Sequence, residues 1–393
     1  MKKSILISMY SHAELYPPTL NAIGELSKIF DQVVLIQRSH LINEWKYPLN
    51  VKVISHGKLM TTKQQENSSI FLKLALFLSF TWLIFTTSLK IRPAIILVYD
   101  PLAFMSFQLA KPFLNGKKLV WYHNHDIWET FQLRKYSISW FSLYFERKYF
   151  KKLDVFTLPA KNRLEYFPIK NFTGKCFVIP NYPAILFYSK FYGPPKIEKE
   201  IKLIFQGSVS EMHGLEQIIE LLALEIAGKH LNLIVKGPCS PQYKQKLEEI
   251  ALKFNVVDKL FFYGVTSYNE VPKIASMCHI GIGIHAKNDV MNITLGTASN
   301  KLYEYAAVGL PILYFNSPHF NQYLKQYKWA FSVELNSESI RQAIETIVRD
   351  YEGLSTQAHF DFTNSLNYET HFIPVADYLF EFLKLNRKFD QPF

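Results

Sequence analysis

The chain has 393 residues, of which 49% are hydrophobic and 20% charged, so a disordered or low-complexity protein is excluded. This length favours two domains, and three cysteines in so long a chain exclude a disulfide scaffold. Lys and Arg number 44 against 33 Asp and Glu, and the net charge of +11 indicates an anionic partner. Nucleic acid, an acidic membrane surface and a phosphorylated substrate would each meet that requirement.

The amino terminus begins with Met1-Lys2-Lys3 and continues with an apolar run that is too short for the core of a signal peptide. No small-residue cleavage site follows it. We therefore interpret residues 4–10 as a buried strand and expect a cytoplasmic protein. Cys176, Cys239 and Cys278 are then expected to be free thiols, and their spacing is too wide for a compact zinc motif.

Apolar strands and helical stretches alternate through the first half of the chain. Strands are predicted at 4–10, 32–37, 51–55, 94–99, 118–122, 154–158 and 176–179, and helices at 18–30, 70–89, 101–114 and 137–151. This alternation is typical of βαβ units and a parallel sheet. Residues 1–182 are therefore predicted to form a Rossmann-like domain.

The segment 70–89 is apolar over about the length that a membrane span requires. A spanning helix, a helix in the membrane interface and a buried core helix are all compatible with its composition. A span would place the preceding and following strands on opposite sides of a bilayer, although both look like parts of one sheet. We therefore favour an interfacial or core helix.

Basic residues cluster around this segment, which favours an anionic membrane surface over nucleic acid as the partner. A solvated basic surface is an alternative that stays open. The protein would then be peripheral on the inner face of the cell membrane. The basic residues are Lys90, Arg92, Lys111, Lys117, Lys118, Arg134, Lys135, Arg147, Lys148, Lys151 and Lys152.

The alternation stops between residues 183 and 200, where prolines, a glycine and charged residues predict a linker. Beyond it, strands are predicted at 202–205, 231–235, 260–263, 280–285 and 311–315, and helices at 215–225, 241–254, 268–277, 301–308 and 337–351. Residues 201–368 are predicted to form a second Rossmann-like domain. The carboxy-terminal helix, 369–393, is expected to pack back on the first domain. The predicted fold class is α/β, with two doubly wound domains facing across a cleft.

Two βα connections of the second domain are candidates for anion binding. Gly207-Ser208 follows the first strand and His213-Gly214 opens the next helix, so backbone amides could approach a phosphate there. An ordinary βα turn would look the same. Lys236 ends a buried strand before Gly-Pro, and a solvated loop lysine is the alternative to a ligand contact.

The segment 292–311 carries the most specific pattern. A loop rich in Gly, Thr and Ser, including Leu295, Gly296 and Thr297, leads into a helix, so its amides can converge on an anion. Lys301 in the first turn would add a positive charge. Glu304 follows about one turn later, and its carboxylate suits a diol such as a ribose. An exposed helix turn with a Glu–Lys pair is the less favoured interpretation.

The stretch NKLYEYAAVGLPIL at 300–313 resembles the carboxy-domain signature of retaining glycosyltransferases of the GT-B fold, family 4 type. In that signature a basic residue, a Glu and Gly-x-Pro follow in this order. The element Val178-Ile179-Pro180-Asn181 is similar to the family's Pro-Asn element. The family's first carboxy-domain βα unit resembles FQGSVSEMHGLEQIIELL, and its base-side loop resembles Tyr263-Gly264-Val265. In motif, the resemblance is mainly confined to residues 178–315.

The resemblance implies a nucleotide-diphosphate sugar donor, most readily a UDP- or GDP-sugar, without a bound cofactor. By position, Glu304 would hold the donor ribose and Gly264-Val265 would flank the base. Lys301 and the amides of residues 296–297 would hold the diphosphate, together with Lys236. The family often has a second Glu where this chain has Gly296, so the identity of the sugar stays open.

In the first domain, His125-Asp126 follows a buried strand. The resemblance implies that a His followed by an acidic residue lies here, near the donor sugar, and a histidine titrates near neutral pH. A metal site built on His123 and His125 is the less favoured alternative, because further ligands are lacking nearby. Residues 10–14 are expected to line the acceptor side, with Glu14 a weak candidate for a base.

The function implied by the resemblance is a hexosyltransferase-like glycosyltransferase acting on a glycan or lipid-linked acceptor in surface polysaccharide or glycoconjugate biosynthesis. Retention by front-face attack is expected, with His125, Asp126, Lys301 and Glu304 as catalytic residues. An Asp-x-Asp motif is missing from the expected region, which predicts metal independence. The alternatives are a nucleotide-sugar epimerase of the same fold and, because of Gly296, a catalytically degenerate membrane-associated binding protein.

Overall fold

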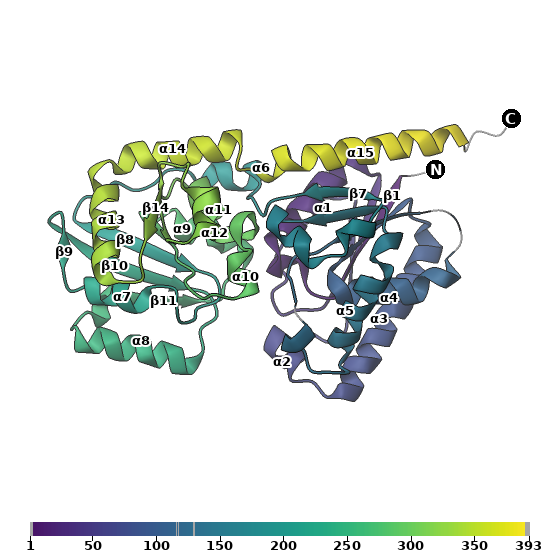
Figure 1. Ribbon diagram of the computed structural model, residues 1–393, viewed down its shortest axis with the longest axis horizontal. Coiled ribbons are helices and arrows are strands. Elements are labelled where there is room, and N and C mark those ends of the chain that lie inside the picture. Colours follow the sequence, from purple (N-terminus) through teal and green to yellow (C-terminus); the bar gives the residue numbers. More distant parts are fainter. Residues whose placement is uncertain (1–2, 115, 117, 129, 390–393) are drawn as a thin grey trace. The chain divides into compact units, whose positions relative to one another are not determined.

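The computed structural model describes residues 3–114, 116, 118–128 and 130–389, and the chain divides into two compact units (Figure 1). The first unit contains Met1–Pro180 and His371–Phe393, and the second contains Asn181–Thr370. Each unit has a parallel sheet covered by helices. The predicted fold class, α/β with two Rossmann-like domains, is therefore confirmed.

The first unit is built on a seven-stranded parallel sheet in the order β3-β2-β1-β4-β5-β6-β7. The apolar runs at its centre are buried on both faces, as a parallel sheet requires. The strand order reverses between β1 and β4, where ligands of such sheets bind at the carboxyl ends. The strands are β1 Ser4–Met9, β2 Gln32–Arg38, β3 Val51–His56, β4 Ile95–Tyr99, β5 Leu119–His123, β6 Val155–Leu158 and β7 Lys175–Val178.

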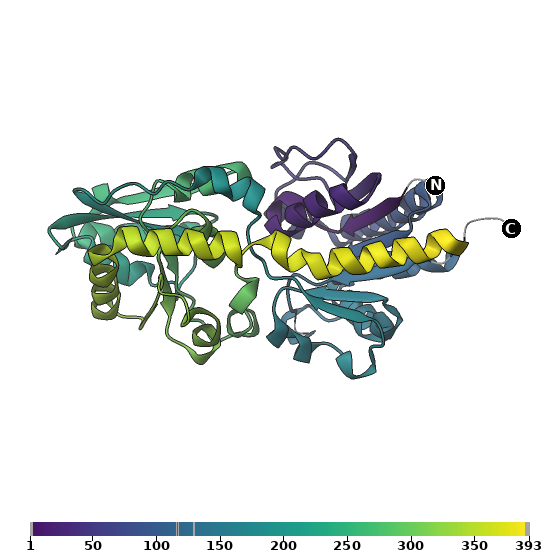
Figure 2. The same ribbon diagram turned by 90° about the horizontal axis from the view of Figure 1, so that it is seen from above.

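Helices cover both faces of this sheet, because neighbouring strand residues point to opposite sides. On one face α4 packs against α3 and α5, and the Phe104 ring of α4 lies 4.9 Å from Tyr122. On the other face Trp121 lies 6.3 Å from Phe372 of α15, and Figure 2 shows α15 lying over the sheet. The helices are α1 Pro17–Ile29, α2 Thr62–Glu66, α3 Ile70–Ile91, α4 Asp100–Ala110, α5 Ile138–Tyr149 and α15 Tyr368–Phe389.

The second unit repeats this architecture with the strand order β11-β10-β8-β12-β13-β14, and the short β9 pairs antiparallel with β10. The order reverses between β8 and β12. The strands are β8 Glu200–Gln206, β9 Glu225–Ile226, β10 Lys229–Lys236, β11 Leu260–Gly264, β12 Ile280–Gly283, β13 Ile312–Phe315 and β14 Ala330–Val333. The helices are α6 Ile185–Tyr188, α7 Leu215–Leu221, α8 Pro241–Lys253, α9 Val271–Ala275, α10 Val290–Ile293, α11 Asn300–Ala307, α12 Pro318–Leu324, α13 Ser337–Arg349 and α14 Tyr351–Asn364.

The stretch 183–200 differs from the predicted linker. It contains α6, its Tyr188 is fully buried, and the Ile185 amide donates to Glu369 Oε1 at 2.9 Å. This stretch therefore packs within the second unit, and the boundary lies after Pro180 instead of residue 182.

The predicted helix 215–225 also ends early, at Leu221. Glu225-Ile226 instead forms β9 of a hairpin whose turn residues, Ala227 and Gly228, have φ of 52° and 69°. Positive φ at both central residues matches the tight turns that join antiparallel strands.

Two glycines of β12 allow α11 to lie close to the sheet. A Cβ on Gly281 would meet the Tyr305 ring at 2.3 Å, and one on Gly283 would meet Leu302 Cδ2 at 2.1 Å. Side chains at these positions would push α11 away from the strand, because packed interiors have little spare volume.

The variant Gly281→Ala is expected to destabilise the second unit by about 1–3 kcal/mol through overpacking. Gly24→Ala is the matched control, because Gly24 lies within α1 and a Cβ there meets nothing within 4 Å. That change is expected to stabilise the protein by about 0.5–1 kcal/mol through helix propensity. Scanning calorimetry measures the melting temperatures of both variants. Equal shifts in melting temperature would contradict the claim that Gly281 lets α11 lie close to β12.

Candidate functional site

Three glycine turns lie at the carboxyl edge of the second sheet. Gly207, Gly237 and Gly264 follow or end β8, β10 and β11, with φ of 123°, 130° and 62°. The Gly207 amide donates to the Lys236 carbonyl at 2.9 Å, and the Gly237 amide donates to the Gly264 carbonyl at 2.8 Å. A Cβ on Gly237 would lie 1.9 Å from the Gly207 carbonyl oxygen. Only glycine lets these backbones approach so closely.

Beyond the hydrogen bonds between these three turns, the carboxyl edge of the second sheet is accessible to solvent. A Cβ on Gly264 would meet nothing within 4 Å, and the side chain of Val265 is 57% exposed. Ser208 is likewise exposed. The three predicted residues at this edge are therefore accessible to a ligand.

Lys301 lies in the first turn of α11 and reaches over this edge. Its Nζ lies 4.1 Å from the centroid of the Phe205 ring and 3.2 Å from the position that a Cβ of Gly207 would take. Burial lowers the pKa of Lys301 to about 7, although the negative charge of Glu304 acts in the opposite direction. Within the part of the chain that the structure describes, no carboxylate lies within 4.0 Å of this ammonium.

Two histidines share the surroundings of Lys301. The His213 ring lies 4.9 Å from the His285 ring and 4.7 Å from Phe205. His213 Nδ1 and His285 Nε2 are buried without a hydrogen-bond partner. Burial, with the nearby charge of Lys301, lowers the pKa of His213 to about 3 and that of His285 well below its usual value.

These three basic side chains, Lys301, His213 and His285, form what we call the basic cluster. Together with burial, the charge of Lys301 lowers the pKa of both histidines, and His213 also lowers the pKa of His285. Buried polar groups of this kind normally have partners. An anion placed among them would satisfy the free ring nitrogens and stabilise the ammonium. The basic cluster therefore fits a phosphate-like ligand.

Glu304 lies three residues after Lys301 in α11 and is 6% exposed. Its Oε2 accepts a hydrogen bond of 2.7 Å from Gln206 Nε2, and its Oε1 lies 3.2 Å from the Tyr268 hydroxyl. Burial raises the pKa of Glu304, against hydrogen bonds from tyrosines and the charge of Lys236. Gln206, Tyr268 and Tyr188 occupy three of the roughly four acceptor positions of this carboxylate, so it can still accept a hydrogen bond from a ligand hydroxyl.

Lys236 ends β10 beside this carboxylate. It is 5% exposed, and burial lowers its pKa while Glu304 and Glu270 attract its charge. The structure therefore brings Lys236 to Glu304, and the described residues show no ion pair between Lys301 and Glu304. The alternative of a surface Glu–Lys pair in α11 is wrong, because Glu304 is buried against β8.

The predicted anion loop is a short 3-10 helix, Gly296–Ala298, with Leu295 before it. Gly296 has φ of 35°, and a Cβ there would lie 2.6 Å from the Tyr323 ring. The carbonyls of Thr297 and Ala298 accept hydrogen bonds of 2.9 and 2.7 Å from Asn181. Tyr323 thus occupies the space that a longer side chain at position 296 would need.

In the first unit, His125 is held by a carboxylate that the sequence analysis missed. Its amide donates to Asp100 Oδ1 at 2.8 Å, and its Nδ1 lies 2.9 Å from Asp100 Oδ2. Its Nε2 lies 2.9 Å from Thr19 Oγ1. Asp100 has a left-handed φ of 62° at the end of β4, a strained conformation that clusters at functional sites.

Asp126, which follows His125 in the sequence, lies among several charged groups. Burial and the nearby Asp100 raise its pKa, although the charges of His125 and Arg163 act to lower it. The fully buried Arg163 donates to the His125 carbonyl, and burial lowers its pKa to about 10 while Asp126 and Asp100 act in the opposite direction. Within residues 3–114, 116, 118–128 and 130–389, no group of three His, Cys, Asp or Glu side chains is placed to hold a metal ion.

Glu14 is held in place by the loop that follows β2. Its carboxylate accepts hydrogen bonds of 2.9 Å from the Trp45 amide and 3.1 Å from the Glu44 amide. Burial acts to raise the pKa of Glu14, but the hydrogen bonds from His12 and these amides outweigh it and lower the pKa. A carboxylate stabilised in this way is a poor base.

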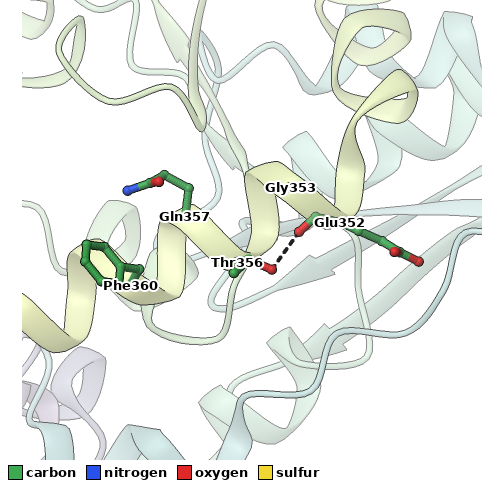
Figure 3. Close-up of a pocket in the computed structure, with 5 residues that line it drawn as sticks. All are labelled: Glu352, Gly353, Thr356, Gln357 and Phe360. Carbon is green, nitrogen blue, oxygen red and sulfur yellow. Dashed lines mark hydrogen bonds between the residues drawn. The ribbon is translucent and has the colours of Figure 1, made fainter.

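Two cavities differ in their volume and in the side chains that line them. The larger, about 460 Å³, lies along α14 and is lined by Glu352, Gly353, Thr356, Gln357 and Phe360 (Figure 3). Thr356 donates to the Glu352 carbonyl and Gln357 donates to Asp361, so two of the polar side chains that line this cavity bond within α14. The smaller, about 130 Å³, lies in the first unit and is lined by Asn124, Ile127, Trp128, Phe131, Leu143, Glu146, Arg147, Tyr166 and Phe167.

Sequence reasoning missed His285, Phe205 and Tyr268 in the second unit. His285 follows β12 by two residues, at the point where the strand order reverses. A polar residue there is a signal that could have been used, because ligands bind at this place. Phe205 and Tyr268 contact the site through packing that only the folded chain shows.

Comparisons with known proteins bear on the second unit and on the fold. Residues 190–360 match the family model described as "Glycosyl transferases group 1". A search of curated proteins finds no match. The structure is similar to sucrose-phosphate synthase from Thermosynechococcus elongatus, with a TM-score of 0.69 and 13% identity over 98% of this chain and 100% of that one.

Two further structures are similar over nearly the whole chain. Anabaena HepE in complex with UDP has a TM-score of 0.62 and 12% identity over 96% of this chain and 100% of that one. A putative UDP-N-acetylglucosamine 2-epimerase from Listeria monocytogenes has a TM-score of 0.58 and 12% identity over 100% and 99%. At these identities the likeness shows the fold. The second unit therefore carries a region that matches the glycosyl transferases group 1 model, and the chain has the two Rossmann-like domains of GT-B glycosyltransferases.

Proposed function

We propose that this protein is a glycosyltransferase that moves a sugar from a nucleotide-diphosphate donor to a glycan or lipid-linked acceptor. The observation that carries the proposal is the basic cluster at the carboxyl edge of the second sheet. Among the described residues, no carboxylate lies within 4.0 Å of Lys301, and one ring nitrogen of each histidine is buried without a hydrogen-bond partner. The family match over residues 190–360 supports the same reaction class.

The basic cluster would hold the diphosphate. As the bond to the sugar breaks, negative charge grows on the leaving phosphate, and preorganised donors stabilise that charge. Lys301 would be protonated when the anion is bound. His213 Nδ1 and His285 Nε2, which have no hydrogen-bond partner, would each form a hydrogen bond with a phosphate oxygen. The amides of Gly296 and Thr297 are further candidates.

Glu304 would bind the ribose hydroxyls, and the base would lie beside Gly264 and Val265. Gln206 and Tyr268 orient the carboxylate, since each lies at one of its oxygens. A UDP-sugar is favoured over a GDP-sugar as the donor, because the similar Anabaena protein was seen with UDP.

The transferred sugar would react by front-face attack with retention, as in the family 4 enzymes that this chain resembles. Position 296 supplies no carboxylate to this sugar, because Gly296 packs on Tyr323. We propose that His125 contacts the sugar, positioned by Asp100 and Thr19, with Asp126 close by in sequence.

The acceptor would bind in the first unit. The cavity of about 130 Å³ follows β5 directly, and it combines aromatic walls with Asn124 and Glu146. The Tyr122 hydroxyl donates to Glu146, and burial raises the pKa of Glu146 to about 7. Aromatic faces beside carboxyl and amide groups suit a sugar, and the setting we propose is surface polysaccharide or glycoconjugate biosynthesis in the cytoplasm.

An epimerase is the second candidate, because the Listeria structure of that name is similar over the whole chain. An epimerase needs no acceptor. Formation of an epimer or free sugar from a nucleotide sugar alone would favour it over transfer.

Replacing Lys301 by Met is expected to weaken UDP binding by about 10- to 100-fold, because a charge-assisted hydrogen bond to phosphate is worth about 1.5–3 kcal/mol. Lys253→Met removes the same charge from the exposed side of α8 and is the control. Calorimetry with UDP and GDP in excess EDTA measures both variants and tests metal independence at the same time. Unchanged binding by Lys301→Met, or no nucleotide binding by the parent protein, would contradict the proposal.

UDP affinity is expected to fall as the pH rises from about 7 to about 9, by up to about tenfold per pH unit. Burial lowers the pKa of Lys301 to about 7, so the free protein loses this proton over that range and binding must restore it. UDP itself stays ionised throughout. Titration calorimetry at several pH values measures the slope, which should vanish in Lys301→Met, and an equal slope in that variant would exclude Lys301 as the titrating group.

A further inference from the structure

The helix α3 presents two opposite faces, and only one of them packs on the protein. Of the helices in the described part of the chain, α3 is the one long and apolar enough to cross a membrane by length and composition, yet only 22% of its most apolar window is buried. The buried residues, Phe77, Phe80, Ile84, Thr87 and Ser88, recur at helical spacing along one side. That side belongs to the core of the first unit.

The opposite side carries large apolar side chains in contact with solvent. Phe71 is 85% exposed, Trp82 is 64% exposed and Leu78 is 54% exposed. Phe113, at the end of the neighbouring α4 segment, is 69% exposed and its ring lies 6.2 Å from Phe85 of α3. We call this surface the α3 face; it consists of Phe71, Leu74, Leu78, Trp82, Leu89 and Phe113.

Burial of one side excludes a membrane-spanning role for α3. Phe80 and Ile84 are completely buried, and His56 Nε2 at the end of β3 lies 2.9 Å from Ser79 Oγ. The strands on either side of α3 in the chain, β3 and β4, lie in one parallel sheet. A span would have to remove α3 from this core and place those strands on opposite sides of a bilayer.

The charges around the α3 face indicate which kind of partner would bind to it. The segment Ile70–Ile91 contains no acidic residue, and Lys90 and Arg92 are exposed at its carboxyl end. Lys73 and the half-buried Lys111 add positive charge near the other apolar side chains. A protein partner would need a matching apolar patch with acidic residues, whereas an anionic bilayer supplies both properties everywhere on its surface.

We infer that the α3 face docks the protein on a bilayer that contains anionic lipid, with α3 lying parallel to the membrane surface. Phe71, Leu78 and Trp82 enter the region between headgroups and acyl chains, where aromatic rings are favoured. Lys90 and Arg92 pair with anionic headgroups. This inference goes beyond the proposed reaction, and its test does not depend on nucleotide binding.

The test compares two double variants of the full-length chain by co-sedimentation with vesicles. Leu78→Glu with Trp82→Glu places two charges on the α3 face. Leu252→Glu with Phe360→Glu, at residues 71% and 59% exposed in the second unit, is the matched control. Vesicles of phosphatidylcholine alone are compared with vesicles that contain about one third phosphatidylglycerol.

The parent protein and the control are expected to sediment with the anionic vesicles and to be released by high salt. The α3-face variant is expected to partition at least about tenfold more weakly. All three proteins should melt at similar temperatures and bind UDP equally, because the changed residues are exposed.

Four outcomes would overturn the inference. The first is no sedimentation of the parent protein with anionic vesicles, and the second is equal sedimentation of the two double variants. The third is that the parent protein is a dimer in light scattering and that only the α3-face variant is a monomer. That result would assign the α3 face to a second copy of the chain. The fourth is retention of the protein in cell membranes after alkaline carbonate extraction, which would show that α3 spans the bilayer.

Discussion

The constraint on which the second unit depends is a half-buried lysine, Lys301, that forms no ion pair with any carboxylate in the described part of the chain. Removing an ammonium from water is costly, and the Lys301 pKa of about 7 expresses that cost. The Phe205 ring, at 4.1 Å, compensates only part of it. A protein keeps such a group where a ligand supplies the missing charge, so the cost in the free protein is the reason that an anion would bind strongly.

The surroundings of Lys301 follow from small residues. Gly207 leaves room for the lysine, Gly237 lets two strand ends touch, and Gly281 brings α11 against β12. The same helix then delivers Lys301 to the basic cluster and Glu304 to Gln206, about one turn apart. In the function that we propose, this one helix would supply both a contact to the diphosphate, through Lys301, and a contact to the ribose hydroxyls, through Glu304.

Local patterns predicted much of this, because apolar periodicity and cap residues are properties of short segments. The fold class, the order of strands and helices and the placement of Lys301 and Glu304 near the sheet edge came from such patterns. Pairings between distant residues were out of reach: Asp100 on His125, Tyr323 on Gly296 and Glu369 on Ile185 join segments 25 to 184 residues apart. The segment 183–200 was misjudged for the same reason, since its helix is held by Glu369.

Of the 44 Lys and Arg residues behind the net charge of +11, one, Lys301, belongs to the basic cluster of the second unit, and Lys90 and Arg92 are among those exposed beside α3 in the first. The central claim concerns the basic cluster. A crystal structure of the protein soaked with UDP tests it most directly. The account predicts diphosphate oxygens within hydrogen-bond distance of Lys301 and of at least one of His213 and His285, with the ribose on Glu304. UDP bound with its diphosphate away from Lys301, or no UDP at this edge of the sheet, would contradict it.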